Sequence, residues 1–260
     1  MNCVKMKLVK GMAVGFLAGW LLAGCSSGYS LAGVEGGRIA ITDKYDRNTD
    51  PEALSILKPY QQKVDSIMKP VIGHSARALS AYRPESPLSN WIADVLRQSA
   101  VRAIGKPADV AVMNMGGIRN AMPEGEITYG TIYEIAPFEN ALCILTMDGA
   151  TLKELFAEIA SVHGEGLSGA VLQIDEEGNL LDAKVNGRPV EEKKVYTVAT
   201  IDYLAEGNDR MMAFRKAQSK TFPKDALLRG LLLDAVKQCE QKGQFVSAQV
   251  EGRIKVSASN

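Results

Sequence analysis

The clearest pattern in the chain is a short apolar run, Val110–Met113, that stops at an amide, two glycines and a guanidinium. Consecutive apolar residues that end so abruptly predict a strand buried on both faces. Gly116 and Gly117 let the backbone turn sharply and come close to a ligand. Asn114 and Arg119 would then lie at the carboxyl end of the strand, where open α/β sheets bind their ligands. A tight turn with a surface arginine is the competing interpretation.

Two stretches before this strand carry apolar residues at helical spacing. The first begins where Asp50 can cap a helix with Pro51 at its first position, and it runs toward Pro70. The second begins at Ser86-Pro87 and closes at Gly105, a residue type that commonly ends helices. The apolar stripes consist of Leu54, Leu57, Val64 and Met68 in the first stretch and Leu88, Trp91, Ile92, Val95 and Leu96 in the second.

Two more helices are predicted after the strand. The apolar run Ala141–Met147 leads through Asp148-Gly149 into a helix in which Thr151 and Glu154 have capping-box spacing. The last helix covers about Lys224–Gln241. Their apolar faces consist of Leu152, Leu155, Phe156 and Ile159 in one helix and Leu227, Leu228, Leu231, Leu232 and Val236 in the other.

The remaining apolar runs are short and either alternating or β-branched. Three of them, Val171–Ile174, Leu180–Val185 and Val195–Thr200, are separated by turn sequences, which predicts a β-meander. Gln244–Val256 is predicted to return as a strand, and Arg38–Ile41 is a possible edge strand. Helices and strands mixed in this way indicate an α/β (α+β) fold, a single layered domain with a mixed sheet flanked by helices.

The first 24 residues have the pattern of a bacterial lipoprotein signal peptide. Three lysines accompany the apolar segment Gly11–Ala23, which is too short to span a bilayer, and Leu22–Cys25 has the form of a lipobox. Cleavage would leave Cys25 as a lipidated first residue, residues 25–50 as a tether and residues 51–260 as the domain. We therefore expect a protein of the bacterial cell envelope, anchored to a membrane on its periplasmic or surface side. An ordinary secretory signal cut elsewhere is the alternative.

Charge and cysteine content limit the partners. The whole chain has 30 basic and 30 acidic residues, and loss of the three signal lysines leaves a net charge of −3 with no basic stripe. This balance argues against polymeric DNA or RNA as a ligand. Cys143 and Cys239 are predicted to be buried free thiols, with a disulfide as the alternative.

Two apparent motifs are rejected on spacing. Asp46, Asn48 and Asp50 imitate the start of a calcium loop, but proline and leucine stand where that loop needs glycine and glutamate. The segment Gly164–Gly169 fits the glycine pattern of a dinucleotide-binding turn, yet it follows a predicted helix instead of a strand. We expect it to be a loop.

Four separated segments together resemble a known family. They are Glu85–Asp94, Asn114–Arg119, Pro137-Phe138 and Tyr196–Asp209. In this order and spacing they are similar to the C-terminal domain of the 5′-nucleotidase / UDP-sugar hydrolase family, over roughly Pro51 to Val256. In that family the C-terminal domain holds the nucleoside, while a separate N-terminal metallophosphatase domain with two metal ions hydrolyses the phosphate ester.

The resemblance assigns roles to individual residues. Phe138 and Tyr203 match two aromatic positions that sandwich the base, and stacking of this kind accepts any base because every base has a π-face. Asp209 matches a carboxylate that accepts hydrogen bonds from the ribose hydroxyls. Arg119 matches an arginine near the ribose and phosphates, and Asn114 an amide close to the base. The candidate substrate-binding residues are therefore Asn114, Gly116, Gly117, Arg119, Phe138, Tyr203 and Asp209.

The chain departs from the family pattern in three places. Tyr203 stands where phenylalanine is usual. The segment Gly207–Arg210 replaces Gly-Gly-Asp-Gly, so the requirement for a positive φ is expected to fall on Asn208. Arg210 is either a phosphate contact or a solvated loop residue. Arg83 is the nearest counterpart of a further family arginine, but it lies one position out of register.

The family's catalytic machinery has no counterpart in these residues. Hydrolysis there requires two metal ions with Asp, His and Asn ligands, whereas this sequence has two histidines, His74 and His163, without such neighbours. We therefore expect no catalytic residue and no cofactor in this chain, with the divalent metals held by a separately encoded metallophosphatase chain. Whether the chain is an enzyme stays open. The alternatives are a structural lipoprotein without a ligand, or an enzyme of unrelated chemistry that uses Glu85, Asp94 or Asp209.

Overall fold

The computed structural model describes residues 31–47 and 49–257, so the predicted signal peptide and Cys25 lie outside the described residues. The chain divides into two compact units, one ending at Leu54 and one starting at Ser55. The first contains the short 3-10 helix η1, Asp43–Tyr45. No strand or bridge is assigned at Arg38–Ile41, so the possible edge strand predicted there is wrong. In the described part, no helix combines the length and the apolar character that crossing a bilayer requires.

Helix α2, Pro51–Met68, forms where the sequence predicts it. The Asp50 carboxylate accepts hydrogen bonds from the backbone N–H groups of Glu52 and Ala53, at 2.8 and 3.4 Å, and so caps the first turn. Its apolar stripe does not enter the core, because none of the residues of this helix is buried among the described residues.

The site is built on a central mixed sheet. Its strands are β2 Val110–Met113, β4 Leu142–Asp148, β5 Gly166–Ser168, β9 Val195–Ile201 and β10 Ser219–Thr221. Within the described residues their order is β10-β4-β9-β2-β5. β2 and β9 run parallel, and the other neighbours are antiparallel. Helices pack on this sheet, which confirms the predicted α/β (α+β) class.

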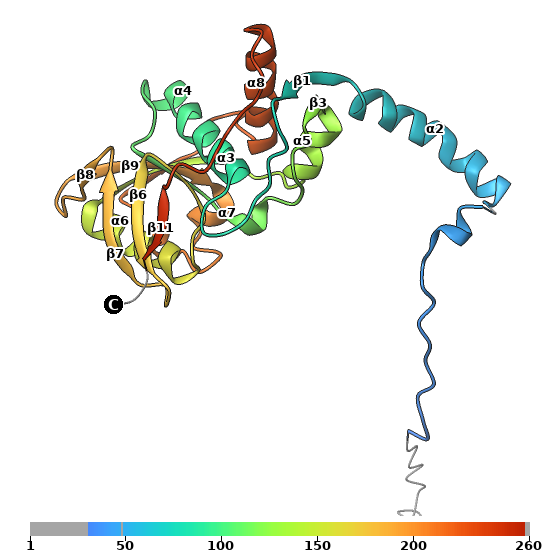
Figure 1. The fold of residues 1–260 in the computed structure, drawn as a ribbon, viewed down its shortest axis with the longest axis horizontal. Helices are drawn as coiled ribbons and strands as arrows, with labels where there is room; N and C mark the ends of the chain where they lie inside the picture. Colours follow the sequence, from blue (N-terminus) through green and yellow to red (C-terminus); the bar gives the residue numbers. More distant parts are fainter. Residues whose placement is uncertain (1–30, 48, 258–260) are drawn as a thin grey trace, which may run out of the picture. The chain divides into compact units, whose positions relative to one another are not determined.

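Two smaller sheets complete the described fold. One has the order β11-β6-β7-β8, and the other pairs β1 with β3. Their bounds are β1 Val71–Ser75, β3 Gly125–Thr128, β6 Ala170–Asp175, β7 Leu180–Val185, β8 Arg188–Pro189 and β11 Ile254–Ser257. β6 lies between β7 and the parallel strand β11, as Figure 1 shows.

The predicted β-meander and two neighbouring predictions need correction. β6 and β7 form a hairpin, but the third run, β9, leaves it and takes the centre of the main sheet, because most of its residues are buried. The glycine pattern Gly164–Gly169 is not a loop throughout, since it contains strand β5. In the segment 244–256 only Val246, bridged to Ser75, and the residues from Ile254 onward pair as strands.

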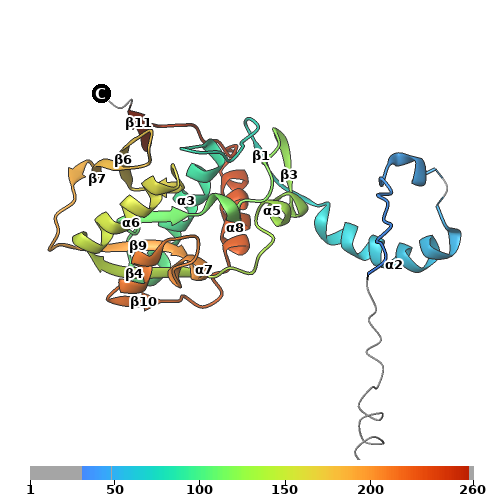
Figure 2. The ribbon, with the colours of Figure 1, turned by 90° about the horizontal axis from the view of Figure 1, so that it is seen from below.

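The helices confirm most of the sequence prediction. They are α3 Pro87–Ser99, α4 Val101–Ile104, α5 Tyr129–Ile135, α6 Gly149–Ser161, α7 Asp202–Ala205 and α8 Leu228–Gln241, with 3-10 turns η2 Met115–Gly117 and η3 Met212–Lys216. α3 packs against β2, β5 and β9 and lies beside α8, whereas α6 packs between the central sheet and the β6–β7 hairpin (Figure 2).

Two helix starts differ from the prediction. Asp148, and not Thr151, caps α6, because its carboxylate accepts a hydrogen bond from the Thr151 N–H at 2.8 Å. α8 begins at Leu228 instead of Lys224, since Asp225 has a left-handed backbone with φ 54° and Leu227 pairs with Ala141.

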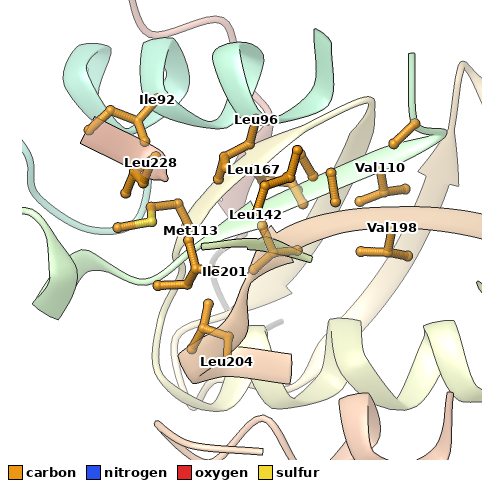
Figure 3. Close-up of a cluster of buried hydrophobic side chains, with 14 of the residues drawn as sticks. Ile92, Leu96, Val110, Met113, Leu142, Leu167, Val198, Ile201, Leu204 and Leu228 are labelled. Carbon is orange, nitrogen blue, oxygen red and sulfur yellow. The ribbon is translucent and has the colours of Figure 1, made fainter. Parts of the chain in front are cut away.

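The core fills both faces of β2 and β9. Figure 3 shows Ile92 and Leu96 of α3 on one side of these strands and Leu204 of α7 on the other. Cys143 on β4 is buried and Cys239 on α8 is half-buried, and both are free thiols. Burial raises the pKa of the Cys143 thiol to about 11, so it is a neutral core residue at physiological pH.

Candidate functional site

A cavity of about 360 Å³ opens where β2 and β9 end. Because the two strands are parallel neighbours, the segments that follow them meet at one edge of the sheet. The lining residues are Asn114, Gly116, Gly117, Phe138, Asn140, Tyr203 and Asp209. Six of the seven predicted binding residues thus surround one cavity, Arg119 is absent from its lining, and Asn140 was not predicted.

The polar side of the cavity is a hydrogen-bonded group formed by Asn114, Asp209 and Tyr203. The Asn114 Nδ2 donates to Asp209 Oδ2 at 2.5 Å, and the Tyr203 hydroxyl donates to Asp209 Oδ1 at 2.8 Å. This bond to the carboxylate raises the pKa of the Tyr203 hydroxyl, which therefore stays protonated at neutral pH. Asn114 is 4% exposed, and its Oδ1 has no hydrogen-bond partner among the described residues. This oxygen is enclosed by protein, so it is the Nδ2 side of the amide that the structure connects to the Asp209 carboxylate.

The apolar side is formed by two aromatic rings from separate segments of the chain. Phe138 is 51% exposed and Tyr203 is 44% exposed, so both rings face solvent-accessible space while lining the same cavity. Phe138 follows α5, and Tyr203 lies in α7 directly after β9. Large aromatic side chains are usually buried in the core. Two that stay half-exposed around one cavity are typical of a binding surface.

The Gly116-Gly117 turn lets the backbone form the cavity floor. A Cβ on Gly117 would lie 2.7 Å from Asn114 Oδ1 and 2.6 Å from the terminal methyl carbon of Met113. A Cβ on Gly116 would meet Asn114 Nδ2 and Asp209 Oδ2 at 3.7 Å, an ordinary contact distance. A Cβ at Gly117 would therefore displace the ends of the Asn114 and Met113 side chains, whereas a Cβ at Gly116 would meet only ordinary contacts.

The loop that carries Asp209 uses different left-handed positions from those predicted. Gly207, Asp209 and Arg210 have φ angles of 81°, 53° and 66°, whereas Asn208 does not have a positive φ. Asn208 instead donates from Nδ2 to the Tyr203 carbonyl at 2.7 Å and accepts at its own carbonyl from the Met211 N–H. Asparagine therefore closes the turn by hydrogen bonding, and the unfavourable backbone conformation falls on the carboxylate residue itself.

The Phe138 loop is held by α8, which the sequence did not indicate. The Arg229 guanidinium donates to the carbonyls of Ala136 and Pro137, at 3.4 and 3.1 Å, and lies 4.5 Å from the centre of the Tyr133 ring. The backbone N–H of Leu228, the first residue of α8, donates to the Asn140 carbonyl at 2.8 Å. These contacts fix the loop on both sides of Phe138. Arg229 has no local motif, so only the tertiary structure identifies it.

The predicted arginines lie outside the cavity lining. Arg119 is exposed and donates from Nη1 to the Gly116 carbonyl at 3.1 Å, which places it beside the turn. Arg210 is exposed as well. Arg83 donates to the Gly164 carbonyl at 2.8 Å and pairs with the Glu165 carboxylate.

Glu165 supports the cavity floor from behind and was missed by sequence reasoning. The Glu165 side chain is 2% exposed. Its carboxylate accepts a hydrogen bond from the Met115 N–H at the start of the glycine turn. Burial raises the pKa of Glu165, while the Met115 N–H and the Arg83 guanidinium oppose that rise. The residue lies in the glycine-rich segment that was predicted to be a loop, so no local signal separated it.

Glu85 and Asp94 bind the C-terminal segment and do not line the cavity that contains Asp209. Glu85 is 4% exposed and accepts hydrogen bonds from Asn90 Nδ2 and from the N–H groups of Glu251 and Arg253, at 2.6 to 2.7 Å. Asp94 forms a two-point ion pair with the Arg253 guanidinium, both distances being 2.8 Å. These contacts are typical of structural carboxylates.

The histidines lie apart from the cavity lining. His74 on β1 pairs with Glu240 Oε2 at 3.1 Å, and His163 is exposed with a φ of 57°. Among residues 31–47 and 49–257, no three His, Cys, Asp and Glu side chains are grouped so that they could hold a metal ion.

Comparison with known proteins agrees with this geometry. The profile of the family described as "5′-nucleotidase, C-terminal domain" matches residues 71–216, more than half of the chain. The endonuclease YhcR of Bacillus subtilis is 33% identical over 175 residues, which are 64% of this chain and 14% of that protein. The silent protein UshA(0) of Salmonella typhimurium is 30% identical over 179 residues, which are 66% of this chain and 32% of that protein. The chain thus matches less than a third of the length of either relative.

Solved structures give the same result. A 5′-nucleotidase precursor from Thermus thermophilus superimposes with a TM-score of 0.69 and 26% identity, over 79% of this chain and 43% of that one. The NAD nucleotidase of Haemophilus influenzae, at 19% identity and a TM-score of 0.59, shares the fold. The profile match, the relatives and the superposition agree that this chain belongs to the 5′-nucleotidase C-terminal domain family.

Proposed function

We propose that the chain is a nucleoside- or nucleotide-recognition domain that binds its ligand in the cavity between Phe138 and Tyr203. The observation that carries this proposal is the combination of two half-exposed aromatic rings with the exposed Asp209 carboxylate around one cavity of about 360 Å³. Small-molecule sites combine apolar walls with a few directed polar groups in this way, at volumes of about 300–1,000 Å³. Family membership supports a nucleotide-related ligand.

Each side of the cavity suits one part of a nucleoside. The base would stack between the rings with its edge toward the Asn114 amide, and the Asp209 carboxylate would accept hydrogen bonds from the ribose hydroxyls. Arg119, beside the Gly116 carbonyl, is near enough to the glycine turn to meet a phosphate that projects from the cavity. Two aromatic rings alone do not select purines over pyrimidines.

Calorimetry with adenosine, AMP and UDP-glucose tests this binding. Loss of one stacking ring costs about 1–3 kcal/mol, or roughly 5- to 150-fold in Kd, so Phe138→Ala and Tyr203→Ala should weaken binding by that factor. Phe222→Ala is the matched control, because Phe222 is also 51% exposed and lies outside the cavity lining. Equal weakening by the control, or no heat with any ligand, would contradict recognition. The latter result would favour a structural lipoprotein.

The proposal extends to hydrolysis by a partner. The two metal ions of the family's reaction would be held by a metallophosphatase encoded as a separate chain, since this chain has two histidines in all and neither lines the cavity. Association in trans would make turnover depend on the concentrations of both chains. The purified chain with divalent metal and AMP should therefore release no phosphate above background. Turnover by the chain alone would overturn this part of the proposal.

The location of the protein is part of the same proposal. Residues 1–24 would direct export, Cys25 would carry the lipid, residues 25–50 would tether, and residues 51–260 would form the recognition domain on the periplasmic or surface side of a bacterial membrane. Metabolic labelling with a fatty-acid analogue tests the anchor. Label should enter the wild-type chain and be lost in Cys25→Ala, and an unlabelled wild-type chain would contradict it.

A further inference from the structure

The Asp209 carboxylate is held from two sides before any ligand binds. Its Oδ2 accepts from Asn114 at the end of β2, and its Oδ1 accepts from the hydroxyl of Tyr203 in α7. Asp209 itself is exposed and has a left-handed backbone with φ 53°. An exposed side chain on such a loop would ordinarily sample several rotamers. Here two donors from different elements keep it in one position.

Tyr203 has two separable functions in this arrangement. Its ring lines the cavity, and its hydroxyl binds the carboxylate. A phenylalanine at this position would provide the ring without the hydroxyl. Stacking on the ring therefore does not explain the bond from Tyr203 to Asp209.

We propose that the Tyr203 hydroxyl is a positioning group that orients the Asp209 carboxylate for a ligand with two adjacent hydroxyl groups. The inference rests on the proposed nucleoside site and deepens it, because it gives the Tyr203 hydroxyl a role of its own, separate from stacking, in the binding of a diol by Asp209.

The hydrogen-bonding capacity of the carboxylate supports this assignment. Each carboxylate oxygen accepts about two hydrogen bonds, and the protein supplies one described side-chain donor to each. One acceptor position on each oxygen is left, and two adjacent hydroxyl groups donate to two such positions. Holding the carboxylate in advance removes the entropic cost of ordering it when the diol binds.

The charge state of the pair is consistent with this role. The bond to Asp209 raises the pKa of the Tyr203 hydroxyl above its ordinary value of 10, so the hydroxyl is a donor throughout the neutral pH range. A phenolate could not donate, and it would repel the carboxylate. Diol binding should therefore weaken as the pH rises through the pKa of Tyr203, and this weakening should be absent when the hydroxyl is removed.

The test compares adenosine with 2′,3′-dideoxyadenosine, which has the same base and no diol. Tyr203→Phe should weaken adenosine binding by roughly 3- to 10-fold and leave the dideoxy compound unchanged. Tyr82→Phe is the matched control, because Tyr82 is 51% exposed and lies outside the cavity lining. Adenosine binding that is unchanged or tighter in Tyr203→Phe would overturn the inference. So would equal weakening of both ligands, which would mean that the hydroxyl only places the ring.

A double-mutant cycle establishes whether the hydroxyl acts through the carboxylate. In an Asp209→Ala background, Tyr203→Phe should have no further effect on adenosine binding, because the group that the hydroxyl orients is gone. An unchanged effect in that background would overturn the inference.

Titration of the ligand-free protein separates this inference from the proposed function. The ultraviolet difference between wild type and Tyr203→Phe should show a tyrosine that ionises above pH 10, and Asp209→Asn should lower that pKa. If adenosine binds equally to wild type and Tyr203→Phe, the inference fails and the nucleoside site stands. If no nucleoside binds although the raised pKa is observed, both fail.

Discussion

Glu85 and Asp209 are carboxylates from two of the segments that identify the family, and the structure uses them in opposite ways. Glu85 is buried and accepts hydrogen bonds from the backbone of the C-terminal segment, including the N–H groups of Glu251 and Arg253. Asp209 is exposed and accepts only from side chains that line a cavity, as far as the described contacts show. The first group joins distant parts of the chain, and the second leaves acceptors for a ligand.

An unpaired polar atom does not by itself distinguish the two groups. Asn90 beside Glu85 and Asn114 beside Asp209 both have a buried Oδ1 without a described partner. What differs is access, because Asn114 lines the cavity together with two half-exposed aromatic rings. The family motifs therefore contain both structural residues and binding residues. Burial and hydrogen-bond partners in the structure distinguish the two kinds.

The largest effect is expected from removing the structural carboxylate. Glu85→Ala leaves the Asn90 amide and backbone N–H groups of the C-terminal segment without their acceptor, so it should lower the free energy of unfolding by about 3–5 kcal/mol. Urea denaturation measures this loss. Adenosine affinity of the folded fraction should not change, and a variant that keeps its stability while losing affinity would reverse the comparison.

A steric test on the cavity floor should have the next largest effect. Gly117→Ala places a Cβ within 2.7 Å of Asn114 Oδ1, which should cost about 1–3 kcal/mol of stability by overpacking and weaken ligand binding. Gly230→Ala in α8 is the control, because nothing lies within 4 Å of its Cβ, and it should stabilise the protein by about 0.5–1 kcal/mol. Thermal unfolding of both variants checks the prediction. A Gly117→Ala variant with wild-type stability and wild-type ligand affinity would contradict it.

Removing the cavity amide should separate binding from stability. Asn114→Ala deletes one hydrogen bond to Asp209 together with the unpaired acceptor, so the free energy of unfolding should change by less than about 1 kcal/mol. Adenosine affinity should fall by about 1–2 kcal/mol, since the Asp209 carboxylate loses the amide donor that holds it in place. Calorimetry and urea denaturation on the same sample give both values. A larger loss of stability than of affinity would place Asn114 with the structural group.

A smaller effect is expected at the support of the Phe138 loop. Arg229→Met keeps the aliphatic packing and removes the donors to the Ala136 and Pro137 carbonyls. Ordering the freed loop on binding should cost about 0.5–1.5 kcal/mol of adenosine affinity. Arg229→Lys should recover part of it, because one donor is restored. Unchanged affinity in Arg229→Met would show that Phe138 is positioned by other contacts.

The smallest effect is a pH dependence at Glu165. Burial raises the pKa of this carboxyl in the folded protein, so its contribution to stability is fully present below the unfolded-state pKa of about 4.5 and is lost as the pH rises through the folded-state pKa. The stability of wild type relative to Glu165→Gln should therefore fall as the pH is raised from 4 upward. Urea denaturation across this range checks the sign, and a rising difference would contradict it.

Local patterns predicted much of the fold and the turn after β2, whereas Phe138, Tyr203 and Asp209 of the cavity lining were predicted from the family resemblance. β2, the apolar face of α3 and the inward face of α6 follow from periodicity, and the turn after β2 follows from its glycines. The central place of β9 and the pairing of β5 depend on contacts distant in sequence, which no single segment encodes.

The residues that support the cavity were missed for the same reason. Arg229 resembles any polar residue on a helix, and Glu165 lies in a glycine-rich segment that suggested a loop. Their roles depend on contacts with residues distant in sequence. Arg229 donates to the Pro137 carbonyl, and Glu165 accepts from the Met115 N–H. The position of the left-handed residues after Gly207 also depends on tertiary contacts of that loop, and a motif comparison assigned it to Asn208.

A crystal structure of the protein soaked with adenosine tests the nucleoside site most directly. We expect the adenine between the Phe138 and Tyr203 rings and the ribose hydroxyls within hydrogen-bonding distance of the Asp209 carboxylate. A base bound elsewhere on the surface, or a cavity without adenosine at saturating concentration, would contradict it.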